Sequence, residues 1–591
     1  MDILSVIGSK IEIAINTLFG ANEKVSLQPT RKEFEGDYTF VFFSLVKSLK
    51  KSPIEIGNTI GTYLLENNKE FESYNVVQGF LNLKLKNEVW VEVLNDLLKE
   101  KTGEDLGNKK GSVMVEYSSP NTNKPLHLGH LRNNFLGFSV SKIMEAAGYQ
   151  VTKACLVNDR GIHICKSMVA YQNFGANETP ESAGLKGDHL VGKYYVEFDK
   201  AYKNQINSLV ENGSTEEDAK KKAPIMVEAQ EMLLKWEQND PETIELWKKL
   251  NGWVYDGFAK TYKQIGVEFD KTYYESDTYL LGKTLVEEGL KNGVFYQKED
   301  KSVWIDLTEE GLDHKLVLRG DGTSVYITQD LGTTDLKFDD FKSDKSIWVV
   351  GNEQDYHFQV LFAIMKKLGR AYAHGCYHLS YGMVDLPSGK MKSREGTVVD
   401  ADELVSDMIA TAKAMSAEKG KIEDLESEES KRLFRMLALG ALKYYLLKVE
   451  PKKRMLFNPE ESIDFQGNTG PFIQYTHARI KSILRKGEIS DDKIFDLVGD
   501  YFLNPEEKEL VFLLKDYTSI IQAAAAEYSP AQLANYTYEL AKTFNVFYAQ
   551  HSVMNEENED SKYLRLGLIK KVAETIKHAM GLLGIDVPER M

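Results

Sequence analysis

The segment YSSPNTNKPLHLGH at residues 117–130 constrains the fold of this chain more than any other part of it. It follows an apolar run at residues 113–117 and leads into a helix that we expect at about residues 127–147. Two prolines stiffen the turn between these elements. A second apolar run follows at residues 151–157, so the pattern predicts a strand–helix–strand unit of a parallel sheet.

Two histidines stand at the start of the expected helix. His127 and His130 are three residues apart, so a helical first turn places both imidazoles on one face, beside unpaired backbone N–H groups and the positive end of the helix dipole. Gly129 between them removes a side chain where a flat base can rest on the backbone. We interpret this turn as a phosphate site; the ordinary alternative is a pair of cap or surface residues.

The remaining sequence divides into three parts by its pattern. Residues 1–108 predict a small α+β unit, and residues 109–429 predict an α/β domain that is interrupted by a charged helical insertion at about residues 177–260. Residues 430–591 are nearly all helical in pattern, with apolar residues at helical spacing. These apolar faces are expected to form core and not to carry sites.

Composition excludes several classes of protein. The 591 residues include 73 Lys or Arg and 89 Asp or Glu, a formal charge of −16, so contacts with nucleic acid must be local. The three cysteines, Cys155, Cys165 and Cys376, lack C-x-x-C spacing and indicate neither a disulfide framework nor a zinc knuckle. The longest apolar stretch, residues 437–447, is too short to cross a bilayer. We expect a soluble protein in a reducing compartment.

A second segment with chemical potential is GKMKSREG at residues 389–396. It places Lys390, Lys392 and Arg394 within five residues between two glycines. Such a basic loop suits a polyphosphate whose charge moves during transfer. By itself the segment is weak support, because basic loops are usually only solvated.

In this order, the two segments resemble the two signature sequences of class I aminoacyl-tRNA synthetases. Neighbouring motifs narrow the resemblance to the arginyl-tRNA synthetase family, and it spans essentially the whole chain. These motifs are Glu116 with SPN at residues 119–121, YITQD at 326–330, GNEQ at 351–354 and QYTHAR at 474–479. The basic loop reads K-M-K-S where the family usually has K-M-S-K-S, so which lysine meets which phosphate stays open.

The resemblance implies the fold and the domains. It implies an α/β protein whose catalytic domain, residues 109–429, is a Rossmann-like parallel sheet with the helical insertion. It implies an N-terminal α+β domain at residues 1–108 that recognises the elbow of tRNA near the D-loop. It also implies an all-helical anticodon-binding domain at residues 430–591.

The implied activity is that of a ligase. The enzyme would activate L-arginine with ATP to arginyl-adenylate and transfer arginine to the 3′-terminal ribose of tRNA(Arg), releasing AMP and pyrophosphate. Mg²⁺ would arrive with ATP, and no tightly bound metal is predicted. We expect a monomer in the cytoplasm. The alternatives are another H-x-G-H nucleotidyltransferase, a class I synthetase for another amino acid, and an inactive tRNA-binding paralogue.

The resemblance also assigns residues. The expected catalytic residues are Lys124, His127, Gly129, His130 and Lys392, and ATP is also expected to meet Lys390 and Ser393. Arginine is expected to contact Glu116, Ser119, Asn121, His130, Tyr326, Asp330 and Gln354. Expected contacts with tRNA are Phe80, Asn82, Tyr475, His477 and Arg479.

The chemistry of these residues suits a planar guanidinium, which needs carboxylates for paired hydrogen bonds and a ring or amide that frames its plane. Tyr326 and Asp330 are four residues apart and share a face if they are helical. Each residue alone also fits an ordinary role, such as an edge-strand charge for Glu116, a helix cap for Asp330 or core for Tyr326 and Phe80.

Overall fold

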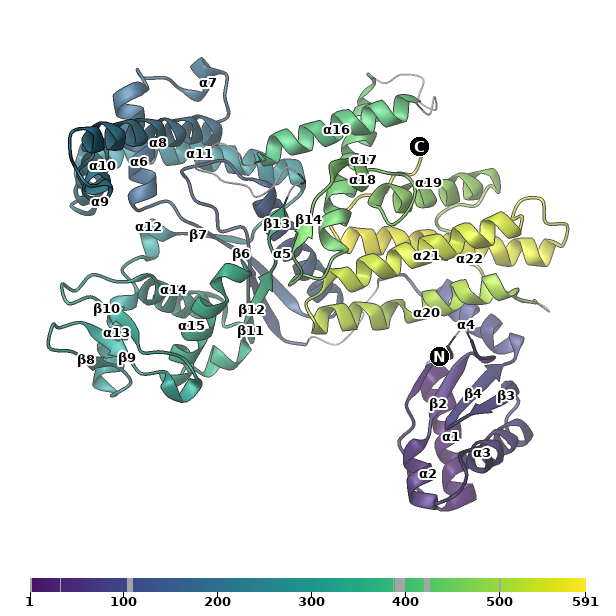
Figure 1. Ribbon diagram of the computed structural model, residues 1–591. Helices are drawn as coiled ribbons and strands as arrows, with labels where there is room; N and C mark the ends of the chain where they lie inside the picture. The colour runs from purple at the N-terminus through teal and green to yellow at the C-terminus, as the bar shows by residue number, and fades with distance from the viewer. Residues whose placement is uncertain are drawn as a thin grey trace.

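A computed structural model describes residues 3–31, 33–103, 110–385, 387, 399–418, 426–498 and 501–591. Figure 1 shows an α/β region with a helical bundle above it, a second group of helices beside it, and the N-terminal unit below that second group. The parallel sheet of the α/β region confirms the predicted fold class.

The N-terminal unit combines four helices with a four-stranded antiparallel sheet in the order β1-β2-β4-β3. Its elements are α1 (Ile3–Phe19), β1 (Leu27–Pro29), β2 (Tyr38–Val41), α2 (Phe43–Leu49), α3 (Pro53–Asn67), β3 (Phe71–Val77), β4 (Phe80–Leu85) and α4 (Asn87–Lys99). Amides on α4 tie the unit to the helical part of the chain: the Asn87 side chain bonds the backbone of Tyr501 and Leu503, and Asn95 accepts from the Leu497 N–H.

Five parallel strands form the central sheet in the order β12-β11-β5-β6-β7. They are β5 (Ser112–Glu116), β6 (Gln150–Val157), β7 (Lys271–Tyr274), β11 (Lys345–Gly351) and β12 (Cys376–Tyr381). Helix α5 (Leu128–Ala146) connects β5 to β6, as the sequence predicts. The strand order reverses between β5 and β11, and ligands bind beyond the carboxyl ends of strands at such a point.

Two insertions separate the strands. Between β6 and β7 lie α6 (Ile162–Phe174), α7 (Pro180–Ala183), α8 (Gly187–Glu211), α9 (Glu216–Lys222), α10 (Pro224–Glu237) and α11 (Pro241–Ile265). Between β7 and β11 lie α12 (Glu275–Thr278), α13 (Gly282–Lys291), β8 (Tyr296–Gln297), β9 (Val303–Ile305), η1 (Thr308–Glu310), β10 (Lys315–Leu318) and α14 (Tyr326–Phe341). Strands β8, β9 and β10 form a small antiparallel sheet that the sequence patterns did not indicate.

The crossover from β11 to β12 holds η2 (Asn352–Gln354), α15 (Asp355–Lys367) and η3 (Ala371–Gly375). Beyond β12, a short strand β13 (Val384–Asp385) pairs in parallel with β14 (Met455–Leu456), far along the chain. This ladder lies at the base of the segment that carries the second motif.

The C-terminal part is helical. It contains α16 (Ala401–Glu418), α17 (Glu428–Leu447), α18 (Pro459–Ser462), α19 (Gly470–Lys486), α20 (Pro505–Ala526), α21 (Pro530–Gln550) and α22 (Glu559–Leu582). The expected boundary at residue 430 falls inside the first turn of α17, and α16, which packs on α17, precedes it. Among the described residues, no helix combines the length and apolar character that crossing a bilayer requires.

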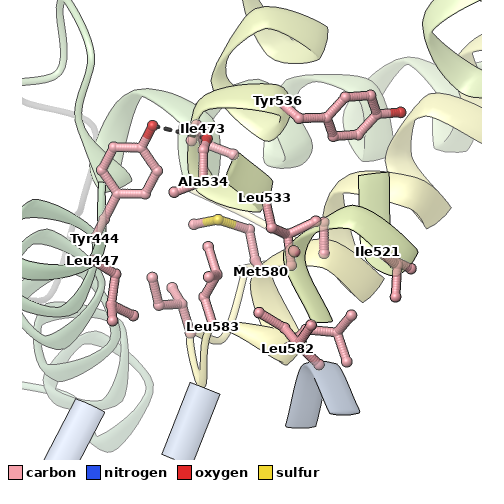
Figure 2. Close-up of a cluster of buried hydrophobic side chains, with 14 of the residues drawn as sticks. Tyr444, Leu447, Ile473, Ile521, Leu533, Ala534, Tyr536, Met580, Leu582 and Leu583 are labelled. Atoms are coloured by element: carbon pink, nitrogen blue, oxygen red, sulfur yellow. Dashed lines mark hydrogen bonds between the residues drawn. The ribbon is translucent and has the colours of Figure 1, made fainter. Parts of the chain in front are cut away.

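Figure 2 shows part of the core between these helices, where Tyr444 lies above Leu447 with its hydroxyl toward Ala534, and leucines gather around Met580. The Tyr444 ring is fully buried, and its hydroxyl lies 3.0 Å from the carbonyl oxygen of Ala534 and 2.5 Å from Oδ1 of Asn468. A buried hydroxyl needs such a partner, because an unpaired one would lose its hydration without compensation.

We predict that Tyr444→Phe lowers the free energy of unfolding by about 1–2 kcal/mol, because it removes the buried hydroxyl whose proton bonds Oδ1 of Asn468 and the Ala534 carbonyl. Thermal unfolding of the full-length chain, followed by calorimetry, measures the effect. The matched control is Tyr445→Phe, whose hydroxyl makes a 3.3 Å contact at the surface. Equal shifts for the two variants would contradict the importance of the buried hydrogen bond.

Candidate active site

The two histidines cap the helix that follows them. His127 is the residue before α5, and its Nδ1 accepts from the Gly129 N–H at 3.1 Å, while Nδ1 of His130 accepts from the His127 N–H at 3.2 Å. The two ring centroids are 4.0 Å apart. The structure therefore brings the two rings together at the helix start, as their spacing predicts.

Both imidazoles are held in the neutral form. Burial, reinforced by the charge of Lys124, lowers the pKa of His127 to about 3. Burial also places the pKa of His130 well below its ordinary value, with smaller contributions from His127 and Lys124. Because each Nδ1 accepts a hydrogen bond, each proton is on Nε2. The turn thus presents neutral N–H donors beside a helix N-terminus, an arrangement that binds anions.

A strained turn leads from β5 to these histidines. Ser118 and Ser119 have φ angles of 78° and 44°, in the left-handed region that serine rarely adopts. Side chains of α5 and α11 hold the turn: the Ser118 N–H donates to Oδ1 of Asn133 at 2.5 Å, and the Ser118 hydroxyl lies 2.7 Å from that of Tyr262. Such strain costs on the order of 1–3 kcal/mol per residue and is concentrated at functional sites. Asn121, at the end of this turn, is exposed.

The chain returns to the histidine turn after the second motif. Lys390, Lys392 and Ser393 lie outside the described residues. The backbone that follows them pairs with the turn: Leu128 N–H donates to Val399 at 3.1 Å, and Ala401 N–H donates to Leu126 at 3.0 Å. A cavity of about 270 Å³ lies beside this pairing, lined by Lys124, His127, His189, Lys193, Asp400 and other residues.

A buried arginine connects the same helix to the other end of the second motif. Arg132, on α5, is fully buried, and its guanidinium donates to the carbonyls of Gly382 at 2.9 Å, Pro451 at 3.0 Å and Lys453 at 2.9 Å. Burial lowers the pKa of Arg132 to about 10. These carbonyls belong to the segments that enter the β13–β14 ladder, so α5 contacts both flanks of the basic segment.

A charged cluster joins the helical insertion to the start of α16. Ligand atoms of Asp188, His189 and Asp402 lie within 4.8 Å of one another. The Lys186 ammonium lies 3.2 Å from Asp188 and also bonds Asp402. Although burial opposes ionisation, His189, Lys186 and Thr261 hold the pKa of Asp402 at about 2. In this structure the Lys186 ammonium supplies positive charge that compensates the carboxylates of Asp188 and Asp402.

Part of the expected arginine pocket lies on the first turns of two neighbouring helices. Tyr326 begins α14 and is 80% exposed, while Asp330 follows one turn later. Oδ2 of Asp330 lies 2.6 Å from Nε2 of His357 on α15. Gln354 is exposed at the junction of η2 and α15. These side chains are therefore accessible to a ligand from solvent.

Glu116 differs from the prediction. It ends β5 at the expected edge, but its carboxylate is buried and forms an ion pair with the buried ammonium of Lys337, on α14. A carboxylate neutralised in this way is not free to grip a cation. This ion pair corrects the expectation that Glu116 and Asp330 together hold a guanidinium; no local pattern pointed to Lys337, which lies more than two hundred residues away along the chain.

The second acid near Asp330 is Glu275, which the sequence analysis missed. Burial is the main cause that raises the pKa of Glu275 to about 7; the charge of Arg160 opposes this rise, and smaller contributions from Asp159 and Asp330 add to it. Glu275 begins α12 directly after β7, at the carboxyl edge of the sheet. An acidic residue directly after a strand would have marked this position as a candidate site, but the sequence patterns did not identify β7 as a strand.

Asp159, in the unassigned sequence NDRG after β6, has a structural role. Its buried carboxylate accepts from the Tyr255 hydroxyl at 2.8 Å and from the backbone and side chain of Ser276. Its carbonyl accepts from the Trp247 indole at 2.7 Å. Asp159 thus fixes the segment that carries Glu275 against the helical insertion.

The expected RNA contacts divide into accessible and buried residues. Tyr475 and Arg479, on α19, line a cavity of about 290 Å³ with Phe465, Phe472 and Met591 among its other walls. The Arg479 guanidinium lies 4.8 Å from the centre of the Tyr475 ring. This cavity offers aromatic faces and a cation, which suit an unstacked base.

Two expected RNA contacts are buried, and these predictions are corrected. Nδ1 of His477 donates to the Pro588 carbonyl at 2.9 Å inside the core. Asn82 lies inside the N-terminal sheet, where its Oδ1 accepts from the Thr39 hydroxyl at 2.6 Å. Phe80 is half-buried, and its ring lies edge-on to the exposed Phe43 with centroids 5.3 Å apart. Only Phe80 of these three has surface to offer a partner.

Known protein families match almost the whole chain. The model described as tRNA synthetases class I (R), catalytic domain, matches residues 92–458. The DALR anticodon binding domain matches residues 473–591, and the arginyl tRNA synthetase N terminal domain matches residues 5–85.

Relatives and solved structures point the same way. An arginine–tRNA ligase of Amoebophilus asiaticus is 56% identical over 596 residues, and one of Flavobacterium psychrophilum is 55% identical over 610 residues, each covering 100% of both chains. The arginyl-tRNA synthetase of Thermus thermophilus shares the fold with a TM-score of 0.77 at 24% identity over 100% of both chains.

We predict that His127 stays uncharged throughout the range from pH 8 to pH 5, because burial opposes its protonation. Since its folded pKa of about 3 lies below the unfolded value of 6.5, the unfolded chain binds more protons in between, and stability falls as the pH drops from 6.5 toward 3. NMR of histidine-labelled protein, with His127→Asn for assignment, measures the titration. A His127 midpoint near pH 6.5 would contradict the buried, neutral state.

Proposed function

The chain belongs to the arginyl-tRNA synthetase family, and from this premise we propose how its residues perform the reaction. The enzyme activates L-arginine with ATP to arginyl-adenylate and transfers arginine to the 3′-terminal ribose of tRNA(Arg), releasing AMP and pyrophosphate. The relatives support arginine as the amino acid and give no support to another amino acid or to an inactive paralogue.

The observation that carries the ATP site is the pair of neutral imidazoles at the start of α5. We assign His127, Gly129 and His130 to ATP: the Nε2–H groups and the helix N-terminus meet the phosphates, and Gly129 leaves room for the base. Lys390, Lys392 and Ser393 are assigned to the same phosphates, because the chain beyond them pairs with the histidine turn. Lys124, which lines the adjoining cavity, supplies a further cation.

Activation needs alignment and charge stabilisation more than covalent work by the protein. The arginine carboxylate attacks the α-phosphorus in line, and pyrophosphate leaves. His127, His130, Lys124 and Lys392 stabilise the charge that develops on the phosphate oxygens. Mg²⁺ enters with ATP as part of the substrate and neutralises phosphate charge. No protein nucleophile is required.

Transfer to tRNA follows in the same site. A hydroxyl of the terminal ribose, the 2′-OH in class I enzymes, attacks the carbonyl carbon of the adenylate. AMP departs as the leaving group, and its phosphate keeps the contacts that ATP made. The neutral imidazoles suit both steps, because they donate hydrogen bonds to the phosphate without adding a positive charge that would hold the product in the site.

The arginine pocket is assigned to Asp330, Tyr326 and Gln354, with Glu275 in place of Glu116. Burial is the main cause of the pKa of about 7 for Glu275, and the charge of Asp330 adds to it, so a bound guanidinium stabilises the ionised form of both carboxylates. The exposed Tyr326 ring can cover the plane of the guanidinium.

Ser119, Asn121 and His130 are assigned to the amino-acid end of the substrate. Ser119 and Asn121 belong to the turn that joins β5 to the histidines, next to the proposed ATP site. We assign Glu116 a structural role next to this turn, because its carboxylate forms an ion pair with Lys337.

We assign tRNA contacts to surfaces outside the α/β domain. The cavity that contains Tyr475 and Arg479 is proposed to take an unstacked base of the anticodon. Residues 1–108, with Phe80 at the surface, are proposed to meet the tRNA elbow, residues 109–429 to carry the chemistry, and residues 430–591 to read the anticodon. We also propose that the enzyme acts as a monomer in the cytoplasm.

Pyrophosphate exchange with each amino acid in turn, with and without bulk tRNA, tests the function directly. We expect exchange with arginine alone among the amino acids, and we include the tRNA because members of this family typically require it for activation. Exchange with a different amino acid, or none with arginine and tRNA together, would refute the proposal.

We predict that His130→Ala lowers the rate of arginyl-adenylate formation by about 10²–10³-fold, because it removes a donor to the transferring phosphate. The Kd of arginine should change by less than about threefold. Single-turnover adenylation gives the rate, and equilibrium dialysis gives the Kd. The matched control is His374→Ala, an exposed histidine on η3, which should change neither. Equal losses in rate and affinity would contradict the assigned role.

We predict that the KM for arginine falls by about tenfold between pH 6 and pH 8. A cation binds the ionised form of Glu275, and with a pKa of about 7 this form becomes dominant over that interval. Glu275→Gln should raise the KM by at least tenfold at pH 8 and flatten its pH dependence. Asp277→Asn, an exposed neighbour, is the control. A wild-type pH profile in Glu275→Gln would remove Glu275 from the pocket.

A further inference from the structure

The carboxylate of Asp330 is bonded to a side chain from a different helix. Nε2 of His357, on α15, lies 2.6 Å from Oδ2 of Asp330, on α14. The Asp330 and His357 side chains are 38% and 28% exposed, so both are half-buried and reach solvent. Because an ionised carboxylate only accepts hydrogen bonds, the imidazole is the donor in this pair.

His357 also stands close to another residue of the proposed pocket. Gln354 precedes α15 and His357 lies three residues later, so both belong to the first turn of this helix and share a face. Helices α14 and α15 pack together, and α12, which begins with Glu275, contacts α14. His357 therefore contacts Asp330 and shares a helix turn with Gln354, two of the residues assigned to arginine, although no family motif drew attention to it.

We propose that His357 is a positioning residue for arginine, which acts by fixing the carboxylate of Asp330. This inference rests on the proposed function and deepens its arginine pocket. A half-exposed aspartate on a helix has several rotamers and a freely turning carboxylate. Recognition of a guanidinium needs the plane of the carboxylate in one orientation, because the two parallel N–H···O bonds form only in that plane.

The hydrogen bond leaves the rest of the carboxylate for the ligand. His357 occupies one lone pair of Oδ2, so Oδ1 and the second lone pair of Oδ2 remain for the two guanidinium N–H groups. An imidazole also donates a single hydrogen bond to this carboxylate, whereas a lysine or arginine in its place would bring three or more donors and compete with the ligand for the remaining lone pairs. The contrast with Glu116 is direct, because that carboxylate is paired with the ammonium of Lys337.

Five variants, one of them a control, test the proposal in arginine-dependent pyrophosphate exchange by the full-length enzyme with tRNA. His357→Ala removes the donor and should raise the KM for arginine by roughly 5- to 20-fold, with kcat and the KM for ATP within about twofold of wild type. His357→Gln, whose amide nitrogen reaches a position close to Nε2, should recover most of the loss. His374→Gln, an exposed histidine of the same domain, is the matched control.

Asp330→Asn, alone and combined with His357→Ala, shows whether the two residues act as a pair. If His357 acts through Asp330, the double variant should be no worse than Asp330→Asn alone. Thermal unfolding of each variant separates a positioning effect from a loss of stability, because positioning should leave Tm within about one degree of wild type.

Each of the other possible outcomes would overturn either this inference or the proposed function. The inference fails if His357→Ala leaves the KM for arginine unchanged while Asp330→Asn raises it. It also fails if His357→Ala changes kcat and the KM for ATP as much as the KM for arginine. A third contrary result is a KM for arginine in His357→Gln that is as high as in His357→Ala. If Asp330→Asn leaves the KM unchanged, the pocket is misplaced and the inference fails with it. If the wild-type enzyme shows no exchange with arginine, the proposed function fails.

Discussion

The start of α5 is the constraint on which the rest of the active region depends. The first N–H groups of a helix need acceptors, and here Nδ1 of His127 and Nδ1 of His130 provide them. This use of Nδ1 fixes the tautomer, and burial removes the positive charge. The two rings can therefore serve as neutral donors at a place whose dipole already attracts phosphate. The strained Ser118–Ser119 backbone is the geometric cost of bringing β5 to this position.

Charge separates the residues that hold the fold from those that bind a ligand. Glu116, Asp188 and Asp402 are acids that lysines of the same chain already neutralise. Among the described residues, no lysine contributes to the shifted pKa of Glu275; the charge of Arg160 lowers this pKa, but burial, with smaller contributions from Asp159 and Asp330, raises it to about 7. A group of acids in this state favours an incoming cation, because binding relieves their repulsion. The acidic total charge of the chain would not have located this region.

Sequence reasoning located elements and motifs better than it located partners. The helix expected at about residues 127–147 is observed at Leu128–Ala146, and the strand expected at residues 151–157 is observed as β6, Gln150–Val157. These features follow from local periodicity. Glu116, Asn82 and His477 were assigned to ligands, but each meets a residue from a distant part of the chain or sheet, and no local pattern reveals such a contact. Glu275 was missed because the edge strand before it is only four residues long.

The anchor made by Arg132 has a consequence for ionic strength. Its guanidinium is out of contact with solvent and bonds backbone carbonyl oxygens that carry no net charge, so dissolved ions have little to screen. Contacts between protein and a nucleic-acid backbone, in contrast, weaken steeply as counterions accumulate. Added salt should therefore release a polyanionic partner from this enzyme well before it disturbs the join between α5 and the base of the β13–β14 ladder.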